Sequence, residues 1–265
     1  MSKSKIIFQL LKSITNPKLI KEIIQERKES REDELHKLHN YQYDFSSIEE
    51  FFNIEFPKQN VSVYDIELKE IEDHVEKFFD KLKNESYPST KKPYPINYSI
   101  NNDSRKFLYI LCRILKPKII VETGVAYGLS SLYILRALEK NNQGKLYSID
   151  SVFRPWQIKD MIGAIIPQEL RNNWELILGK SNERLQEVLD QFDGIDVFIH
   201  DSSHTYKNML YEFSTCFEKL NENGLIISDD ILDNDAFYDF VSKKKIKNYI
   251  IKVVENSGLG IIKRI

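Results

Sequence analysis

The sequence has no apolar run long enough to cross a membrane, and no signal peptide with a cleavage site follows the first Met. It therefore lacks the two features that direct a chain into or across a membrane. We expect a cytoplasmic protein.

A basic excess is also missing. The formal net charge is -2 at pH 7, and hydrophobic residues make up 42% of the chain, which is typical of a globular protein. A dedicated nucleic-acid binder usually carries more positive charge, so no nucleic-acid partner is expected.

Cysteine and histidine are scarce. Cys112 and Cys216 both fall in apolar helical patterns, so we expect reduced core residues rather than a disulfide or a metal site. His36, His39 and His74 lie among acids on predicted helices. Solvated helix faces explain these three histidines better than metal binding.

Glycine is absent from the first eighty residues, where charged residues are dense. Apolar positions recur at helical spacing over residues 5–14, 19–38 and 62–83, which predicts an N-terminal helical segment. The first of these helices is amphipathic and basic. It is expected either to contact a membrane surface peripherally or to pack on its own domain or on a sister subunit of a homo-oligomer.

Residues 86–100 contain three prolines, which forbid a regular helix and favour an extended segment. The segment is either a lid over a ligand pocket or a linker strapped to the surface. We place the domain boundary here. Residues 1–100 then form a helical segment with its lid or linker, and residues 101–265 form the main domain.

The main domain is organised around residues 119–131, IIVETGVAYGLSS. The β-branched run that begins at Ile119 predicts a buried strand of a parallel sheet. Gly124 and Gly128 bracket a turn in which the backbone can take a positive φ or approach a ligand closely. Ser130 suits the start of the helix that follows, where unpaired N–H groups face the sheet edge. A ligand is therefore expected at this turn.

A second predicted strand, residues 146–150, ends in Asp150. In nucleotide-binding α/β sheets an acid at this position accepts hydrogen bonds from ribose hydroxyls. Glu122 ends the first strand in the same way. Together with the glycine turn, these acids indicate a nucleotide-like cofactor.

These motifs resemble the class I S-adenosylmethionine-dependent methyltransferases, whose first motif reads roughly E-x-G-x-G-x-G and whose second strand ends in the ribose-binding acid. The resemblance implies S-adenosylmethionine as the cofactor. One position departs from the motif, because Ala126 replaces the middle glycine. An oxidoreductase with a nicotinamide cofactor is disfavoured, since the stretch lacks G-x-G-x-x-G. The residues that the resemblance assigns to the cofactor are Glu122, Gly124, Ala126, Gly128, Ser130, Asp150, Ser181 and Asp201.

Ser181 rests on a separate argument. Residues 174–179 predict a third strand, and the loop after this strand lines the adenine in the methyltransferases that the chain resembles. Ser181 is therefore a cofactor candidate. The alternative is that Ser181 or Asn182 only caps the next helix.

Carboxylates follow two further apolar strands. Asp201 follows the run that begins at Ile195, and Asp229 and Asp230 follow the run that begins at Asn223. If these are adjacent parallel strands, the three carboxylates converge at one edge, where like charges are costly unless a cation neutralises them. Carboxylate oxygens suit Mg²⁺. The alternative is that these acids only cap a helix or end a strand.

The D-x-x-H-x-Y pattern that starts at Asp201, followed one strand later by an acidic pair, resembles the metal-dependent O-methyltransferases, particularly the macrocin-type sugar O-methyltransferases. The resemblance implies that Asp201, Asp229 and Asp230 hold Mg²⁺ or Mn²⁺. It implies that His204 is the general base and that the acceptor is a hydroxyl of a small molecule or sugar. His200 is expected to face the opposite side of its strand.

The rest of the chain completes a Rossmann-like α/β fold. The remaining elements are predicted helices over residues 103–116, 156–166, 207–220 and 233–244, and final strands over residues 249–255 and 258–265. A closing hairpin with an antiparallel last strand is usual in this methyltransferase fold. We therefore expect a seven-stranded mixed sheet with helices on both faces, preceded by the N-terminal helical segment.

Two other functions stay open. One is a metal-independent methyltransferase in which the same aspartates bind the substrate. The other is a non-catalytic cofactor-binding or scaffold protein, against which the full set of acids and histidine argues. The acceptor is equally open, among a sugar hydroxyl, a catechol-like phenol and a lipid-linked glycan.

Overall fold

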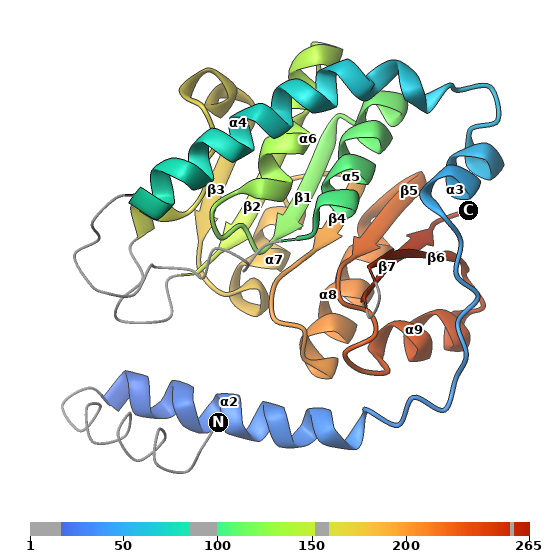
Figure 1. Ribbon diagram of the computed structural model, residues 1–265. Coiled ribbons are helices and arrows are strands. Elements are labelled where there is room, and N and C mark those ends of the chain that lie inside the picture. The colour runs from blue at the N-terminus through green and yellow to red at the C-terminus, as the bar shows by residue number, and fades with distance from the viewer. Residues whose placement is uncertain (1–16, 85–99, 152–158, 255–256) are drawn as a thin grey trace.

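The computed structural model describes residues 17–84, 100–151, 159–254 and 257–265 (Figure 1). The predicted helix over residues 5–14 and the predicted lid or linker up to residue 99 lie outside these ranges.

The core is a seven-stranded sheet in the order β3-β2-β1-β4-β5-β7-β6. The first five strands in this order are parallel, whereas β7 runs antiparallel to both β5 and β6. The strands are β1 (Ile119–Thr123), β2 (Lys145–Asp150), β3 (Trp174–Leu178), β4 (Ile195–His200), β5 (Leu220–Ser228), β6 (Lys247–Val254) and β7 (Ser257–Lys263). The predicted mixed sheet is confirmed.

Helices cover both faces of this sheet (Figure 1). The helices of the described ranges are α2 (Pro17–Leu35), α3 (Ile48–Glu55), η1 (Val61–Tyr64), α4 (Asp65–Asn84), α5 (Asn102–Leu115), α6 (Leu129–Asn141), η2 (Lys159–Met161), η3 (Gln168–Asn173), α7 (Ser181–Leu189), α8 (Tyr206–Lys219) and α9 (Ala236–Lys244). Helices α4, α5 and α6 share one core with the sheet, and α7, α8 and α9 share the other.

Each strand serves both cores because successive side chains point to opposite faces. In β1, Ile120 belongs to the core under α5 and α6, and Val121 to the core under α7 and α8. Val197 and Phe198 repeat this alternation in β4. The apolar faces thus fix the sheet, and polar side chains gather where the parallel strands end, the edge at which α/β sheets bind ligands.

Helix α3 ties part of the N-terminal segment to the sheet. It begins with a capping box, in which the Ser47 hydroxyl accepts from the Glu50 N–H and the Glu50 carboxylate accepts from the Ser47 N–H. Phe51 and Phe52 of α3 are buried against Phe107 of α5. These residues therefore share the core of the main sheet.

Helix α2 runs across the edge at which the parallel strands end (Figure 1). Near its C-terminal end, Asp33 Oδ1 accepts a hydrogen bond from the Tyr206 N–H at 2.6 Å, and the His36 ring stacks on the Tyr206 ring at 3.7 Å. The His39 N–H donates to Asp235. The expectation of solvated faces for His36 and His39 is therefore wrong in part, since both join contacts with the main domain.

The predicted helix over residues 156–166 is wrong in its described part, where residues 159–166 form η2 and turns. The Gly163 and Ile165 N–H groups donate to carbonyls of the loop after β1, so they are not available for a helical ladder. His74 of α4 also differs from expectation. Its Nε2 lies 3.0 Å from the Ile165 carbonyl oxygen, which fixes α4 to this segment.

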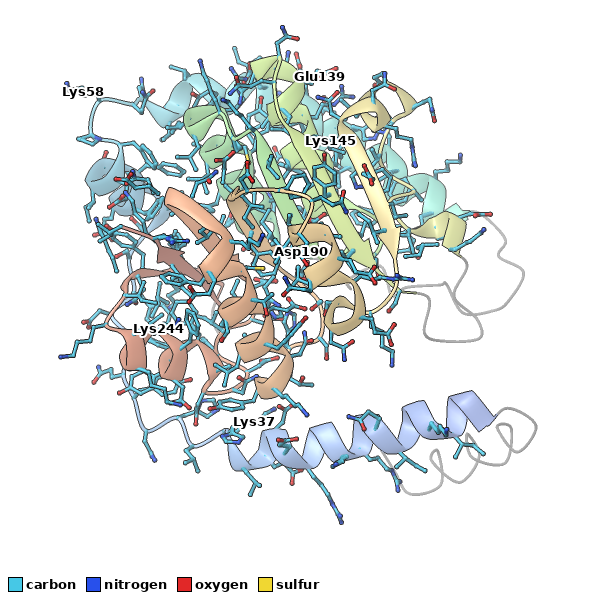
Figure 2. All side chains as sticks on the ribbon, turned by 180° about the vertical axis from the view of Figure 1, so that it is seen from behind. Lys37, Lys58, Glu139, Lys145, Asp190 and Lys244 are labelled. Atoms are coloured by element: carbon cyan, nitrogen blue, oxygen red, sulfur yellow. The ribbon has the colours of Figure 1, made fainter. Side chains whose placement is uncertain are left out.

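Among the described residues, most apolar side chains lie in the interior and most charged side chains lie on the surface, as is usual for a globular protein. Cys112 and Cys216 are buried free thiols. Lys58, Glu139 and Lys244 lie on the outer surface (Figure 2). Across the described ranges, no helix combines the length and apolar character needed to cross a membrane.

Candidate active site

A cavity of about 680 Å³ opens where β1, β2, β3, β4 and β5 end. The predicted site residues that line it are Gly124, Ala126, Ser130, Asp150, Ser181, Asp201, His204, Asp229 and Asp230. The lining does not include Glu122 or Gly128. One cavity thus contains most of the predicted cofactor residues together with the predicted metal ligands and base.

The turn after β1 forms one wall. Gly124 has a φ of 87°, and a Cβ atom there would lie 1.9 Å from the Asp201 carbonyl oxygen. Gly128, with a φ of 90°, leaves room for Gly163. Neighbouring backbone therefore requires both glycines, Gly124 because of the residue that follows β4 and Gly128 because of the segment after η2.

Ala126 adopts a left-handed φ of 47°, a conformation that favours glycine. The strain is offset by Asp150, whose Oδ2 accepts the N–H groups of Val125 and Ala126 at 2.9 and 2.8 Å. Asp150 Oδ1 accepts from the Ser151 N–H. Burial raises the pKa of Asp150, although these hydrogen bonds oppose the rise. Asp150 therefore braces the turn as well as lining the cavity.

Glu122 lies beneath the turn and is fully buried. Its carboxylate accepts hydrogen bonds from the hydroxyls of Ser130, Ser131 and Ser148 at 2.5 to 2.7 Å. Burial raises the pKa of Glu122 despite these hydrogen bonds. The structure thus places Glu122 as the anchor of helix α6 on β1 and β2, and Ser130 donates inward to this anchor.

Ser181 begins α7 but does not cap it. The N-cap is Lys180, which makes no side-chain cap bond, so the predicted caps Ser181 and Asn182 are wrong. The Ser181 hydroxyl instead hydrogen-bonds Asn208 Oδ1 of α8 at 3.2 Å and lines the cavity.

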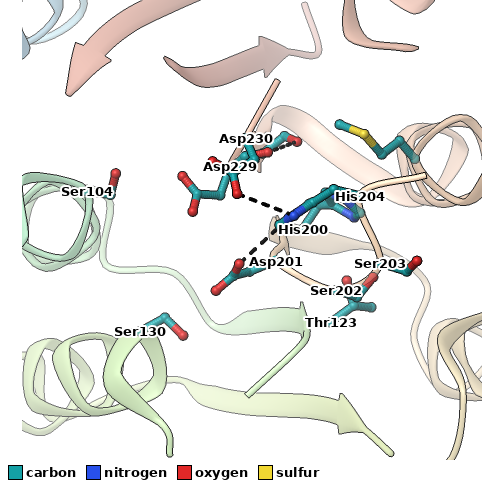
Figure 3. Close-up of polar contacts among 12 residues, drawn as sticks. Ser104, Thr123, Ser130, His200, Asp201, Ser202, Ser203, His204, Asp229 and Asp230 are labelled. Atoms are coloured by element: carbon teal, nitrogen blue, oxygen red, sulfur yellow. Dashed lines mark hydrogen bonds and ion pairs between the residues drawn. The ribbon is translucent and has the colours of Figure 1, made fainter. Parts of the chain in front are cut away.

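Three carboxylates occupy the opposite wall (Figure 3). Burial and the charge of Asp230 raise the pKa of Asp229 to about 7, and burial and Asp229 raise the pKa of Asp201 well above its usual range. Asp229 Oδ1 is buried and has no hydrogen-bond partner among the described residues. Carboxyl groups that are this close together and lack hydrogen-bond partners are costly in their ionised form unless a positive charge compensates them.

His204 lies between these carboxylates, as Figure 3 shows. Its Nδ1 is 3.4 Å from Asp230 Oδ2, and its Nε2 is 3.7 Å from Asp201 Oδ1. Burial and the neighbouring His200 lower the pKa of His204 to about 4. The imidazole is therefore neutral at pH 7 and able to accept a proton.

His200 does not line the cavity, in agreement with the strand alternation. It is fully buried, and its Nδ1 lies 2.6 Å from Glu212 Oε2.

Sequence reasoning missed several residues of the site. Within the described ranges, the histidine and carboxylate atoms that all lie within 4.8 Å of one another belong to His204, Asp230 and Asp233. Asp233 thus lies in one cluster with the predicted residues His204 and Asp230. Its spacing of three residues from Asp230 is the sequence feature that could have predicted this. Gln25 of α2 and Tyr211 of α8 also line the cavity, and no motif marks either of them.

Residues 121–231 match a family model described as a methyltransferase domain. This segment begins within β1 and ends just after β5, so it contains the glycine turn, Asp150 and the three carboxylates. No curated protein matches the chain.

Solved structures share the fold at low sequence identity. An O-methyltransferase from Bacillus cereus, in complex with S-adenosylhomocysteine, is 14% identical with a TM-score of 0.56, over 81% of this chain and 96% of its own. A methyltransferase from Podospora anserina with bound S-adenosylhomocysteine is 15% identical with a TM-score of 0.53, over 74% and 87% of the two chains. The O-methyltransferase TomG from Streptomyces achromogenes, involved in tomaymycin synthesis and in complex with S-adenosylmethionine, is 14% identical with a TM-score of 0.53, over 81% and 94%.

The sheet order and the domain match agree. Residues 121–231 match a methyltransferase domain, and the sheet has the Rossmann-like methyltransferase fold, so the predicted fold and the predicted enzyme class, a methyltransferase, are confirmed.

Proposed function

We propose that this methyltransferase transfers the methyl group of S-adenosylmethionine to a hydroxyl oxygen of a small molecule or sugar, with Mg²⁺ or Mn²⁺ orienting the acceptor. The observation that carries the proposal is the shared cavity. The glycine turn and Asp150 line one side, and His204 with the carboxylates lines the other. Cofactor and acceptor can therefore meet in one cavity.

The turn side fits the cofactor. Gly124, Ala126, Asp150 and Ser181 line this side of the cavity, whose volume lies in the range of small-molecule sites. We assign Asp201 to the same site, since its carbonyl packs against Gly124. Similar structures contain S-adenosylhomocysteine or S-adenosylmethionine, which supports this cofactor here.

The carboxylate side fits a hard divalent cation. Asp229 Oδ1 is buried without a partner, and the raised pKa values of Asp201 and Asp229 mark negative charge that protein groups do not compensate. We assign the cation to Asp201, Asp229 and Asp230, as the motif spacing predicts, although the described ligand atoms that all lie within 4.8 Å of one another belong to His204, Asp230 and Asp233. When bound, the ion would neutralise these acids and lower the pKa of the acceptor hydroxyl.

His204 takes the acceptor proton in this proposal. Its Nε2 has no hydrogen-bond partner among the described residues, whereas Nδ1 faces Asp230. The lowered pKa keeps the ring neutral, so Nε2 holds a lone pair for the proton. The sulfonium is already activated, so the protein needs only to align the acceptor oxygen and to remove its proton.

The narrower assignments are also proposals. We place the chain nearest to the macrocin-type sugar O-methyltransferases, on the spacing of Asp201, His204 and the acidic pair. We propose a cytoplasmic location, a homo-oligomer formed through the N-terminal helices, and no nucleic-acid partner. We also retain the proposed domain division at residue 100.

The first experiment measures the melting temperature with S-adenosylhomocysteine, S-adenosylmethionine and NAD. A ligand at one hundred times its Kd stabilises the folded state by about 2.7 kcal/mol, so the two sulfur ligands should raise the melting temperature and NAD should not. No rise with either sulfur ligand would refute the proposed cofactor.

The second experiment measures methyl transfer to a panel of sugar and phenol hydroxyls. Transfer should stop in EDTA and return with Mg²⁺ or Mn²⁺. Full activity in excess EDTA would establish the metal-independent alternative instead.

A further inference from the structure

Glu212 is a buried acid that does not line the cavity. It lies on α8 between Met209 and Cys216, on the helix face that packs into the core, and its side chain has no exposed surface. A carboxylate removed from water is costly unless several donors compensate it. Glu212 is thus an acid at a helix position where the apolar pattern of α8 predicts an apolar residue.

Four donors surround this carboxylate. Thr123 Oγ1 and His200 Nδ1 each lie 2.6 Å from Glu212 Oε2, and Ser202 Oγ and Asn208 Nδ2 lie 2.8 and 3.0 Å from Oε1. Burial alone would raise the pKa of Glu212, but the attraction of His200 and the hydrogen bonds lower it to about 2. The carboxylate is therefore ionised and fully paired.

The donors come from the segments that build the cavity. Thr123 is the last residue of β1 and precedes Gly124, and His200 and Ser202 flank Asp201. The Asp201 N–H also donates to the Thr123 carbonyl at 2.9 Å. Glu212 thus holds the ends of β1 and β4 together from below the cavity floor.

His200 connects Glu212 to His204, because the hydrogen bond to Glu212 fixes the His200 ring and this ring packs against His204. Because the Glu212 carboxylate can only accept, His200 Nδ1 must carry the proton, and the ring cannot flip without losing this bond. The His200 and His204 rings meet edge to face, with centroids 5.3 Å apart. Among the described residues, the His204 ring nitrogens lie 3.4 and 3.7 Å from carboxylate oxygens of Asp230 and Asp201, too long for strong hydrogen bonds, so packing against the His200 ring is needed to fix the plane of His204.

We propose that Glu212 is a positioning residue for methyl transfer, which sets the orientation of His204 through the His200 ring. The inference rests on the proposed role of His204 as the base. Glu212 itself touches neither cofactor nor acceptor, since it does not line the cavity.

The test compares Glu212→Gln with Glu218→Gln. Glu218 lies on the same helix, pairs with Lys244 at 3.1 Å and is exposed, so its variant makes the same chemical change away from the site. Long-range ¹⁵N–¹H spectra of the five imidazoles report which nitrogen carries a proton and whether a ring has one orientation. Calorimetry with S-adenosylhomocysteine reports the cofactor site.

The wild type and Glu218→Gln should show a His200 ring protonated at Nδ1 and a single His204 signal. In Glu212→Gln both signals should shift or broaden, while the Kd for S-adenosylhomocysteine stays at the wild-type value. With an acceptor that the methylation assay identifies, kcat should fall about 10- to 100-fold, as for other residues that orient a functional histidine.

Unmoved His204 signals in Glu212→Gln would overturn the proposal. Loss of S-adenosylhomocysteine binding in this variant alone would also overturn it, because Glu212 would then support the whole cavity. If Glu212→Gln does not fold, Glu212→Asp replaces it, and an unchanged His204 signal there decides against the proposal. A wild type that binds no S-adenosylhomocysteine would refute the proposed function instead and leave the imidazole comparison readable.

Discussion

Asp201 and Asp229 should lose protons when a cation binds. Burial and the charge of Asp230 raise the pKa of Asp229 to about 7, so roughly half of the molecules carry a proton on this carboxyl at pH 7. A cation favours the ionised form, so binding must release this proton and must tighten as the pH rises through 7.

Titration calorimetry with Mn²⁺ at pH 7 in PIPES and in Tris checks this prediction, because the two buffers take up protons with different heats. The heats should differ in the wild type and differ less in Asp229→Asn. Asp190→Asn, an exposed substitution on the outer surface, is the control and should behave as wild type. Equal heats in both buffers would mean that no proton leaves and that the cation binds elsewhere.

His204 should act as a base well below neutral pH. An unperturbed imidazole titrates near 6.5. Burial and His200 lower the pKa of His204 to about 4, so the neutral form persists down to this pH and the rate should decline only at more acid pH. His204→Ala should lower kcat by about a hundred- to ten-thousand-fold, the usual contribution of a general base.

The pH profile of kcat in the wild type and in His204→Ala measures this directly, and the acid limb should be absent from the variant. His39→Ala changes an exposed histidine outside the cavity lining and serves as the control. A limb between pH 6 and 7 that survives in His204→Ala would assign the base to another group.

The turn between β1 and α6 contains two small residues, Gly124 and Ala126, whose substitutions should differ in their cost to stability. Gly124→Ala places a methyl group 1.9 Å from the Asp201 carbonyl, so β1 and β4 must separate. Ala126→Gly instead removes a side chain from a left-handed φ of 47°. The first change should cost more than about 2 kcal/mol, as strain at a special φ does, and the second should stay within about 1 kcal/mol of wild type.

Urea denaturation gives both free energies of unfolding, and calorimetry with S-adenosylhomocysteine should show weaker binding only for Gly124→Ala. A fully stable Gly124→Ala would mean that the turn can relax away from Asp201. The close approach of the two strands would then not be what requires glycine there.

The central strands β1, β4 and β5 could be predicted from the sequence because each ends in a short apolar run that is buried on both faces, and Gly124, Asp201 and Asp229 directly follow these runs. Glu122 shows the limit of this reasoning. Its motif position predicts a ligand contact, but Ser130, Ser131 and Ser148 converge on it from α6 and β2, and no local pattern shows this convergence. The helix predicted over residues 156–166 fails for the same reason, since its N–H groups bond to the turn after β1.

Glu212 shows why part of the site escapes prediction. A single acid within an apolar helical pattern predicts only an exposed position or a penalty. Its four donors come from β1, β4, the loop after β4 and α8, and only the folded sheet brings these together. Motifs at strand ends can therefore be predicted from the sequence, whereas the buried groups that hydrogen-bond to these strand ends cannot.

At the scale of the whole molecule, α2 is attached to the main domain close to the site. The Asp33 carboxylate accepts the N–H of Tyr206, the first residue of α8, in the manner of an N-cap supplied from another helix. Asp235 accepts two N–H groups from the residues just after α2. Gln25, farther back on α2, lines the cavity.

Asp33→Ala should loosen α2 without unfolding the main domain. Loss of a capping acceptor costs about 1 kcal/mol, which corresponds to roughly a fivefold larger population of detached α2. Trypsin cleavage after Arg27, Lys28 and Arg31 should accelerate by about the same factor, because cleavage of an opened segment follows its population. Mass spectrometry of the fragments assigns the cleaved bonds.

Asp44→Ala is the matched control, an exposed acid farther along the same N-terminal segment. If both variants are cleaved at the same rate, the Asp33 contact does not hold α2. If only Asp33→Ala is cleaved faster, its KM for the acceptor should rise while the Kd for S-adenosylhomocysteine does not change. The KM should change without the Kd because α2 contributes Gln25 to the cavity wall but contributes none of the residues around the glycine turn.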